Sequence, residues 1–142
     1  FPAASVRVQG AGASGMAGIS MPSEARAVFF GAVAGAGDGG NQAMVVTLAG
    51  SSSALPGTEL GSVKISPLSA FPDKGRATKG VRCHKLRASE DEIALAWVGP
   101  GPVRGATAAG KPVTLPAPTD KRDATGTPPS APVAAFGGTI DS

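Results

Sequence analysis

The sequence predicts an all-β protein, on three observations. Glycine and proline supply 21 and 13 of the 142 residues, which favours frequent turns over long helices. Aromatic residues make up only 4%, so the core must be built from Val, Ala, Leu and Ile. Short apolar runs rich in β-branched residues recur between Gly, Pro, Ser and Asp, as strands do in hairpins. We expect strands at residues 5–8, 27–33, 43–49, 61–66, 80–86, 93–98, 103–108 and 112–115.

The connections between these runs are rich in turn residues. Residues 34–42 are glycine-rich and predict a hairpin connection, and the Gly-Pro-Gly-Pro run at 99–102 should end any strand or helix. The most helix-friendly stretch, residues 86–95, is short and contains three consecutive acids, so we expect a turn that leads into a strand. Trp97 and Phe30 are expected to pack inside the sheets.

The chain contains a loose internal repeat, which is a feature of propeller-like and solenoid proteins. Each copy continues from a strand with a basic residue, through a Pro-containing turn, into a basic segment. The copies predict two fairly complete β-units and a fragment of a preceding one. The corresponding segments are 29–33 and 95–99, 44–50 and 104–110, 63–67 and 113–116, and 74–76 and 121–123.

Positive charge is concentrated in one part of the chain. The formal net charge is only +3, but residues 64–87 hold seven basic side chains and the single acid Asp73, a net charge of +6. The other residues therefore sum to −3. A basic stretch within a slightly acidic domain indicates a localised anionic partner rather than general solubility.

Several patterns that suggest catalysis or ligand binding have simpler interpretations. Cys83 is the only cysteine, which excludes an internal disulfide and a cysteine-rich zinc site, and we expect a buried or half-buried thiol. His84 cannot pair with it if both lie in a strand, because adjacent side chains point to opposite faces. His84 is expected either near an anionic partner or simply exposed. The acids at 90–92 are expected to form a solvated turn, and the GxGxxG pattern at 10–15 lacks the helix of a dinucleotide site.

Residues 71–86, Phe-Pro-Asp-Lys-Gly-Arg-Ala-Thr-Lys-Gly-Val-Arg-Cys-His-Lys-Leu, and residues 94–99, Ala-Leu-Ala-Trp-Val-Gly, carry a family resemblance. They resemble the repeat of the C-terminal domain of the A subunit of bacterial DNA gyrase and topoisomerase IV, especially the actinobacterial versions. The segments Val-Arg-Val-Gln-Gly at 6–10 and Gly-Met-Ala-Gly-Ile at 15–19 are similar to the same connection one blade earlier.

The resemblance implies a β-pinwheel, a propeller-like ring of four-stranded antiparallel blades. A ring of about six blades needs more residues than 142, so we expect a partial or shortened ring. Residues 1–128 would form a partial DNA-binding pinwheel of about two to three blades. Residues 129–142 would form a partly irregular tail.

The resemblance also implies a function. The chain would be a non-catalytic domain that binds double-stranded DNA without sequence preference and bends or wraps it for a type II topoisomerase. Its partners would be the cleavage core and the ATPase subunit of an ATP-dependent enzyme in the cytoplasm, at the nucleoid. No cofactor, metal or membrane is expected, and the chain lacks the tyrosine with which such enzymes cleave DNA. The alternative is a structural or protein-interaction β-domain with a basic rim.

The expected DNA contacts are basic residues and glycines at the connections between blades. Lys and Arg neutralise phosphates, and glycine lets backbone amides approach them. Residues 74–79 are the best candidate, the copy at 7–10 is weaker because Ala11 and Gly12 replace basic residues, and Asp120 and Asp123 weaken the third copy. The full set is Arg7, Gln9, Lys64, Lys74, Gly75, Arg76, Lys79, Arg82, Lys85, Lys121 and Arg122.

Overall fold

The computed structural model describes residues 3–31, 33, 43–55 and 58–138. The chain divides into two compact units. The first unit combines Phe1–Arg26 with Pro72–Val81, and the second combines Ala27–Phe71 with Arg82–Ser142. In the described residues the regular elements are six strands and two short 3₁₀ turns, so the predicted all-β class is confirmed.

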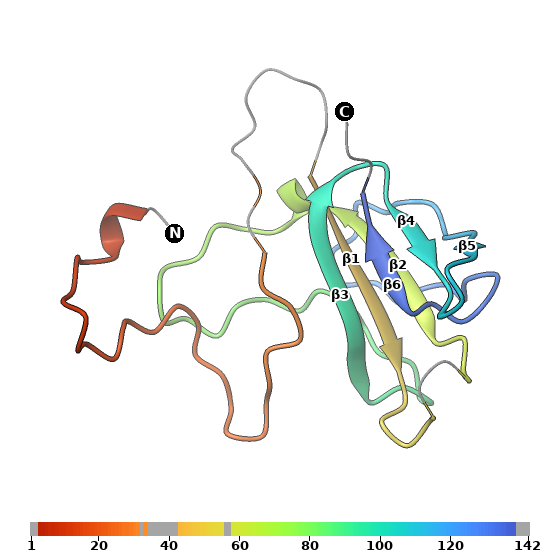
Figure 1. Ribbon diagram of the computed structural model, residues 1–142, viewed down its shortest axis with the longest axis horizontal. Helices are drawn as coiled ribbons and strands as arrows, with labels where there is room; N and C mark the ends of the chain where they lie inside the picture. Colours follow the sequence, from red (N-terminus) through yellow and green to blue (C-terminus); the bar gives the residue numbers. More distant parts are fainter. Residues whose placement is uncertain (1–2, 32, 34–42, 56–57, 139–142) are drawn as a thin grey trace. The chain divides into compact units, whose positions relative to one another are not determined.

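The first sheet of the second unit is built around strand β1, Ala43–Gly50. Strands β2, Ser62–Pro67, and β3, Glu92–Pro100, pair with it on either side, both antiparallel, giving the order β2-β1-β3 (Figure 1). The pairing of β1 with β3 shifts register between Leu48 and Ala49, which marks a β-bulge. The 3₁₀ turn η2, Leu68–Ala70, follows β2 directly.

The second sheet consists of three shorter strands in the order β5-β4-β6, again antiparallel. Strand β4 spans Arg104–Ala106, β5 spans Pro112–Val113 and β6 spans Ala135–Gly137 (Figure 1). Each sheet thus has three strands in the described residues, against four expected per blade.

An irregular segment lies along the edge of β2 that β1 leaves open. The backbone amides and carbonyls of Val63 and Thr127 exchange two hydrogen bonds of 2.9 Å, and the amide of Thr119 donates to the carbonyl of Ile65 at 2.8 Å. Residues 119–127 therefore take the place of a fourth strand without forming one. This contact covers part of an edge that would otherwise be free to pair with another chain.

The two faces of the first sheet are both buried but differ in chemistry. One face packs on the second sheet in a core of Val46, Leu48, Val63, Ile65, Val113 and Val133, with Trp97 and Phe136 packed against it. The other face carries Thr47, Ser62, Lys64 and Ser66, all buried. Strand alternation produces this separation, since successive side chains point to opposite faces.

The internal repeat corresponds to equivalent strands. Residues 44–50 lie in β1 and residues 104–106 form β4, and each of these strands is the centre of its sheet. The third pair of repeat segments, 63–67 and 113–116, corresponds to β2 and to the end of β5, each antiparallel to its central strand. The correspondence between residues 29–33 and β3 does not extend to structure, because residues 29–31 and 33 lie outside any strand.

The first unit is held by a few contacts between its two segments. Its 3₁₀ turn η1 spans Ala3–Ser5, and among its described residues the one bridge of strand type joins Ile19 and Thr78 in parallel. The amide of Ser20 donates to the carbonyl of Thr78, and the amide of Ala77 donates to that of Gly18, both at 2.9 Å.

Several expectations about elements are wrong. Residues 5–8 and 80–86 form no strand, and the described part of 27–33 forms none. Strand β3 continues through Gly99 to Pro100, which an edge strand tolerates because it leaves some N–H positions unpaired. Phe30 is 92% exposed and does not pack inside a sheet. Strand β6 lies in the expected tail, and the loop at 34–42 is outside the described residues.

Candidate nucleic-acid interface

The expected DNA contacts are divided between the two units. The first unit carries one group, and among its described residues the members lie on both segments that compose it. Lys74, Lys79, Arg7 and Gln9 are exposed, whereas Arg76 is half-buried. The first group comprises Arg7, Gln9, Lys74, Gly75, Arg76 and Lys79.

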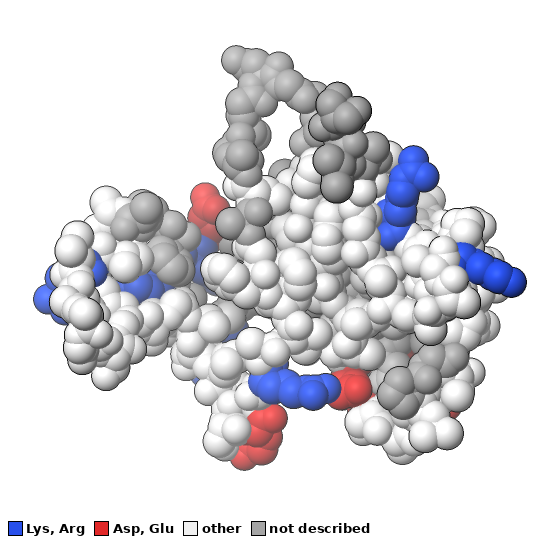
Figure 2. All heavy atoms as spheres, in the orientation of Figure 1, with Lys and Arg blue, Asp and Glu red and all other residues white. Residues whose placement is uncertain are grey.

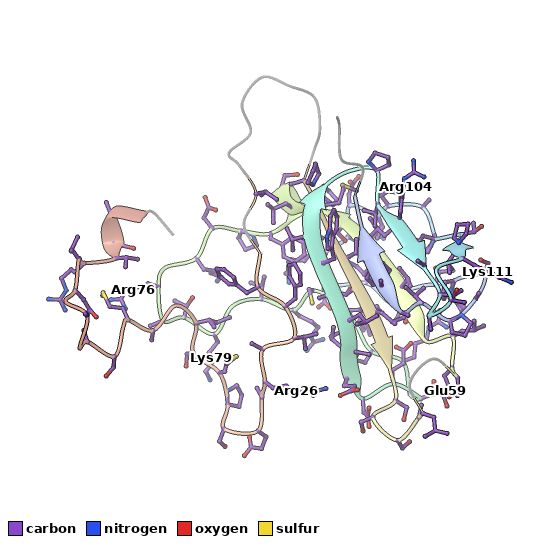
Figure 3. The ribbon with its side chains drawn as sticks, in the orientation of Figure 1. Arg26, Glu59, Arg76, Lys79, Arg104 and Lys111 are labelled. Carbon is purple, nitrogen blue, oxygen red and sulfur yellow. The ribbon has the colours of Figure 1, made fainter. Side chains whose placement is uncertain are left out.

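A tight turn shapes the basic segment of the first unit. The hydroxyl of Thr78 donates to the carbonyl of Gly75 at 2.9 Å, and Ala77 adopts a left-handed φ of 62°. The guanidinium of Arg76 donates to the carbonyl of Ala17 at 3.2 Å, which ties this turn to the N-terminal segment (Figure 3). Arg76 therefore helps to hold the turn with one of its several N–H donors, and its charge remains available to an anion together with Lys74 and Lys79.

The second group lies where residues 82–87 run beside residues 122–126. The guanidinium of Arg122 donates to the carbonyl of Arg82, and the amide of Lys85 donates to the carbonyl of Ala124 at 3.0 Å. Further along, the guanidinium of Arg87 donates to the carbonyl of Gly126 at 2.6 Å. The contacts advance in the same direction along both segments, so the structure brings Arg122 beside a basic stretch that lies far from it in the sequence.

Acidic residues reduce the field of this second group. Asp123 lies 3.7 Å from the guanidinium of Arg82, and the two side chains are 42% and 65% exposed. A pair this exposed is screened by water and leaves Arg82 free to exchange partners. Lys121 and Lys85 are exposed beside it, whereas Arg122 is half-buried.

Lys64 does not reach the surface. Its side chain is only 3% exposed on the polar face of the first sheet, and its ammonium donates to the hydroxyl of Ser66. Burial lowers the pKa of this ammonium below its ordinary value. The expected DNA contact by Lys64 is therefore not supported, because the charged atom is enclosed within the fold.

His84 is neither exposed nor at a surface rim, contrary to both expectations. It is 3% exposed, and its ring contacts Thr47, Ser62 and Gly126. The neighbouring Cys83 is half-buried, as expected, and burial raises the pKa of its thiol. The expected geometry for the pair is wrong, because residues 80–86 are not a strand.

The acids at 90–92 contribute to local structure. The Asp91 carboxylate accepts hydrogen bonds from the amide of Ser52 at 2.6 Å and from its hydroxyl at 2.7 Å, and these bonds lower the pKa of Asp91. Glu90 accepts from the amide of Arg87 at 2.8 Å. These acids therefore fasten the turn before β3, and no group of three potential metal ligands occurs in the described part of the chain.

Three other basic residues belong to neither group. Arg104 and Lys111 point outward from the second sheet as separate charges on a mostly uncharged surface (Figures 2 and 3). Both are exposed, as is Arg26. Together these three side chains carry the same charge as Lys74, Arg76 and Lys79, so they can serve as a charge-matched control.

The basic residues are visible in the sequence, but the contacts that support them are not. Arg87 belongs to the charged run, yet its bond to Gly126 spans 39 positions. No local pattern predicts that Gly126 meets His84, since Gly126 lies among Thr, Ala and Pro residues typical of any loop. Within the described ranges, no helix has the length and apolar character needed to cross a membrane.

Comparison with known proteins identifies the family. A model of the DNA gyrase C-terminal domain, a β-propeller, matches residues 1–34 and 57–95, just over half of the 142 residues. Neither a curated protein nor a solved structure matches the chain. The match includes the basic residues from 64 to 87 and two of the three strands of the first sheet in whole or in part. This chain belongs to the DNA gyrase C-terminal domain family.

Proposed function

We propose that this chain is a non-catalytic domain that binds double-stranded DNA and bends or wraps it for a type II topoisomerase. In this proposal the domain belongs to the A subunit of gyrase or topoisomerase IV of the actinobacterial kind. It would present a duplex segment to the cleavage core, which works with an ATPase subunit. Its location would be the cytoplasm, at the nucleoid.

The observation that carries the proposal is the juxtaposition of residues 82–87 with residues 122–126. Hydrogen bonds at three successive levels fix the two segments side by side. Arg82, Lys85 and Lys121 are exposed there, so their charges can meet successive phosphates. Contacts of this kind release condensed counterions and carry no base sequence information.

The first unit would supply further phosphate contacts from an independent position in the chain. Lys74 and Lys79 flank the turn that Arg76 and Thr78 hold, and Gly75 is exposed within it. Arg7 and Gln9 lie on the other segment of the same unit. We propose that this group contributes more than Lys121 and Arg122, because Asp120 and Asp123 flank that pair.

The test is the salt dependence of binding to random-sequence duplex DNA. The variant K74A/R76A/K79A should lower the slope of log affinity against log salt by about 2 to 3 units, roughly 0.9 for each phosphate that the protein no longer neutralises. The variant K121A/R122A should lower it by less. Both should keep the wild-type fold, checked by circular dichroism.

Two controls separate local contacts from overall charge. The variant R26A/R104A/K111A removes the same charge as the first triple from exposed positions outside the two groups and should change the slope by less than about 1 unit. Lys64→Met removes a buried charge and should leave the slope unchanged. If the wild type binds an acidic protein surface but not DNA at low salt, the alternative of a protein-interaction domain holds instead.

A further inference from the structure

The buried ring of His84 joins three segments of the second unit. One ring nitrogen, Nδ1, lies 2.9 Å from the hydroxyl of Thr47 in β1. The other, Nε2, lies 3.2 Å from the hydroxyl of Ser62 in β2 and 3.0 Å from the amide nitrogen of Gly126. A single side chain thus connects residues 82–87 to the first sheet and to the segment beside them.

The hydrogen bonds define the proton arrangement of the ring. The Gly126 N–H can only donate, so Nε2 must accept and cannot carry a proton. In the neutral ring the proton therefore lies on Nδ1, which donates to the Thr47 hydroxyl. Burial lowers the pKa of His84, in agreement with a neutral ring.

Gly126 is held from both sides by the basic segment. Its N–H donates to His84, and its carbonyl accepts from the guanidinium of Arg87. A Cβ at this position would lie 2.8 Å from Nε2 of His84 and 2.8 Å from the hydroxyl of Ser62. Only glycine fits this gap without displacing the ring. The hydrogen bond between the His84 ring and residue 126 therefore requires a glycine at that position.

We propose that His84 is a positioning residue that fixes Arg82 and Lys85 relative to Lys121 for simultaneous phosphate contact. This inference rests on the proposed DNA-binding function. His84 itself is buried and touches no DNA. It sets the spacing because residues 82–87 form no strand, and one backbone bond, from Lys85 to Ala124, supplements the side-chain bonds that hold their path.

The substitutions His84→Gln and His84→Asn distinguish the role of the Nε2 hydrogen bond from that of the Nδ1 hydrogen bond. The Gln amide oxygen can reach the position of Nε2 and accept from the Gly126 N–H, whereas Asn retains only a donor near the position of Nδ1. We expect H84Q to keep the wild-type salt slope. H84N should lower the slope by about 1 to 2 units and the affinity at 0.1 M salt by about 10-fold or more, because one or two phosphates would no longer be neutralised.

Gly126→Ala tests the same contact from the other segment. Residue 84 is still a histidine in this variant, but the added methyl group forces the ring or the loop to move. The variant should therefore show the same salt slope as H84N. The triple variant R82A/K85A/K121A supplies the reference, because it removes the three charged side chains themselves. When it is combined with G126A, the two reductions in slope should not add, because the misplaced side chains no longer contribute.

The outcomes distinguish the inference from the proposed function. If the wild type shows no salt-dependent DNA binding, the proposed function fails. If the wild type binds but folded H84N and G126A bind with its affinity and slope, His84 has no positioning role. If both variants unfold, hydrogen exchange at the amides of Lys85 and Gly126 in the wild type tests the inference instead. Added DNA should slow exchange at both amides, and unchanged exchange would overturn the inference.

Discussion

The two units carry similar basic side chains on very different supports. In the first unit, two hydrogen bonds of a single bridge and one arginine contact join the segments that hold Lys74 and Lys79. In the second unit, Arg82 and Lys85 lie on a segment that a buried histidine fixes to the first sheet, which in turn packs on the second sheet. The comparison indicates that the charge of a basic segment does not depend on how many contacts hold the segment. A segment with few contacts and a segment fixed to a packed sheet carry the same kind of side chain.

The largest contrast is expected in packing energy. Ile65 is 4% exposed in the core of the second unit, and Ile65→Ala should lower the free energy of unfolding by about 2–5 kcal/mol. Ile19 is 54% exposed in the first unit, so Ile19→Ala should cost less than about 0.5 kcal/mol. Trp97 fluorescence in urea measures the change for Ile65→Ala, because Trp97 packs against the core of the second unit, and hydrogen exchange at the amides of Ser20 and Ala77 measures the change for Ile19→Ala. Equal reductions would remove the contrast.

A second contrast concerns pH. The pKa of His84 is lowered in the fold from its ordinary value near 6.5, so the unfolded chain binds the proton more readily. The contribution of His84 to the free energy of unfolding is therefore fully present above about pH 6.5 and is lost as the pH is lowered, by at most about 1.4 kcal/mol per pH unit. Lys64 and Arg87 oppose protonation of the ring, and Glu90 favours it.

The measurement compares wild type with His84→Gln between pH 8 and pH 5. Urea midpoints of the wild type should fall more steeply than those of the variant, since the variant lacks this titration. Titration of the acids is common to both proteins and cancels in the difference. Parallel curves would show that the buried ring does not couple folding to protons.

A smaller effect is expected in the turn of the first unit. Ala77 has a φ of 62°, a left-handed conformation that costs a residue with a Cβ roughly 1 kcal/mol or more. Ala77→Gly removes this cost, although glycine adds entropy to the unfolded chain, so opening of the turn should become harder by up to about 1 kcal/mol. Hydrogen exchange at the amide of residue 77 reports the change, and faster exchange would contradict it.

The smallest effect is expected at Phe30. Its side chain is 92% exposed, so Phe30→Ser should change the free energy of unfolding by no more than about 0.5 kcal/mol. The internal repeat aligns this region with the strand that contains Trp97, which packs against the core. A decrease above about 1.5 kcal/mol in the urea titration would restore the expectation that Phe30 packs inside.

The sequence predicted those elements whose pattern is local. Residues 61–66 alternate β-branched and polar side chains, whereas residues 43–49 form a short apolar run with adjacent valines, and the two runs form β2 and β1 almost to the expected bounds. The repeat also identified β4 and β5 as the second copy. Short apolar runs bounded by turn residues, and a period of two in residues 61–66, are local signals of a strand.

Contacts across long distances in the chain could not be predicted in this way. Strand β6 has only three residues and depends on β4 for its hydrogen bonds, so its own composition gives little signal. The segment 80–86 has the apolar content of a strand, but its polar bonds to Thr47 and Gly126 hold it in another path. Tertiary contacts override local preference at such positions.

The two buried faces of the first sheet have a consequence for folding fidelity. Thr47 pairs with Lys64, and Val46 pairs with Ile65, so neighbouring pairs face opposite chemistry. A slip of β2 by one residue would turn its side chains to the other face and place the ammonium of Lys64 in the apolar core. That error costs several kcal/mol. The buried Lys64 therefore disfavours misfolded strand pairings, because only the native register places its ammonium on the polar face and Val63 and Ile65 in the core.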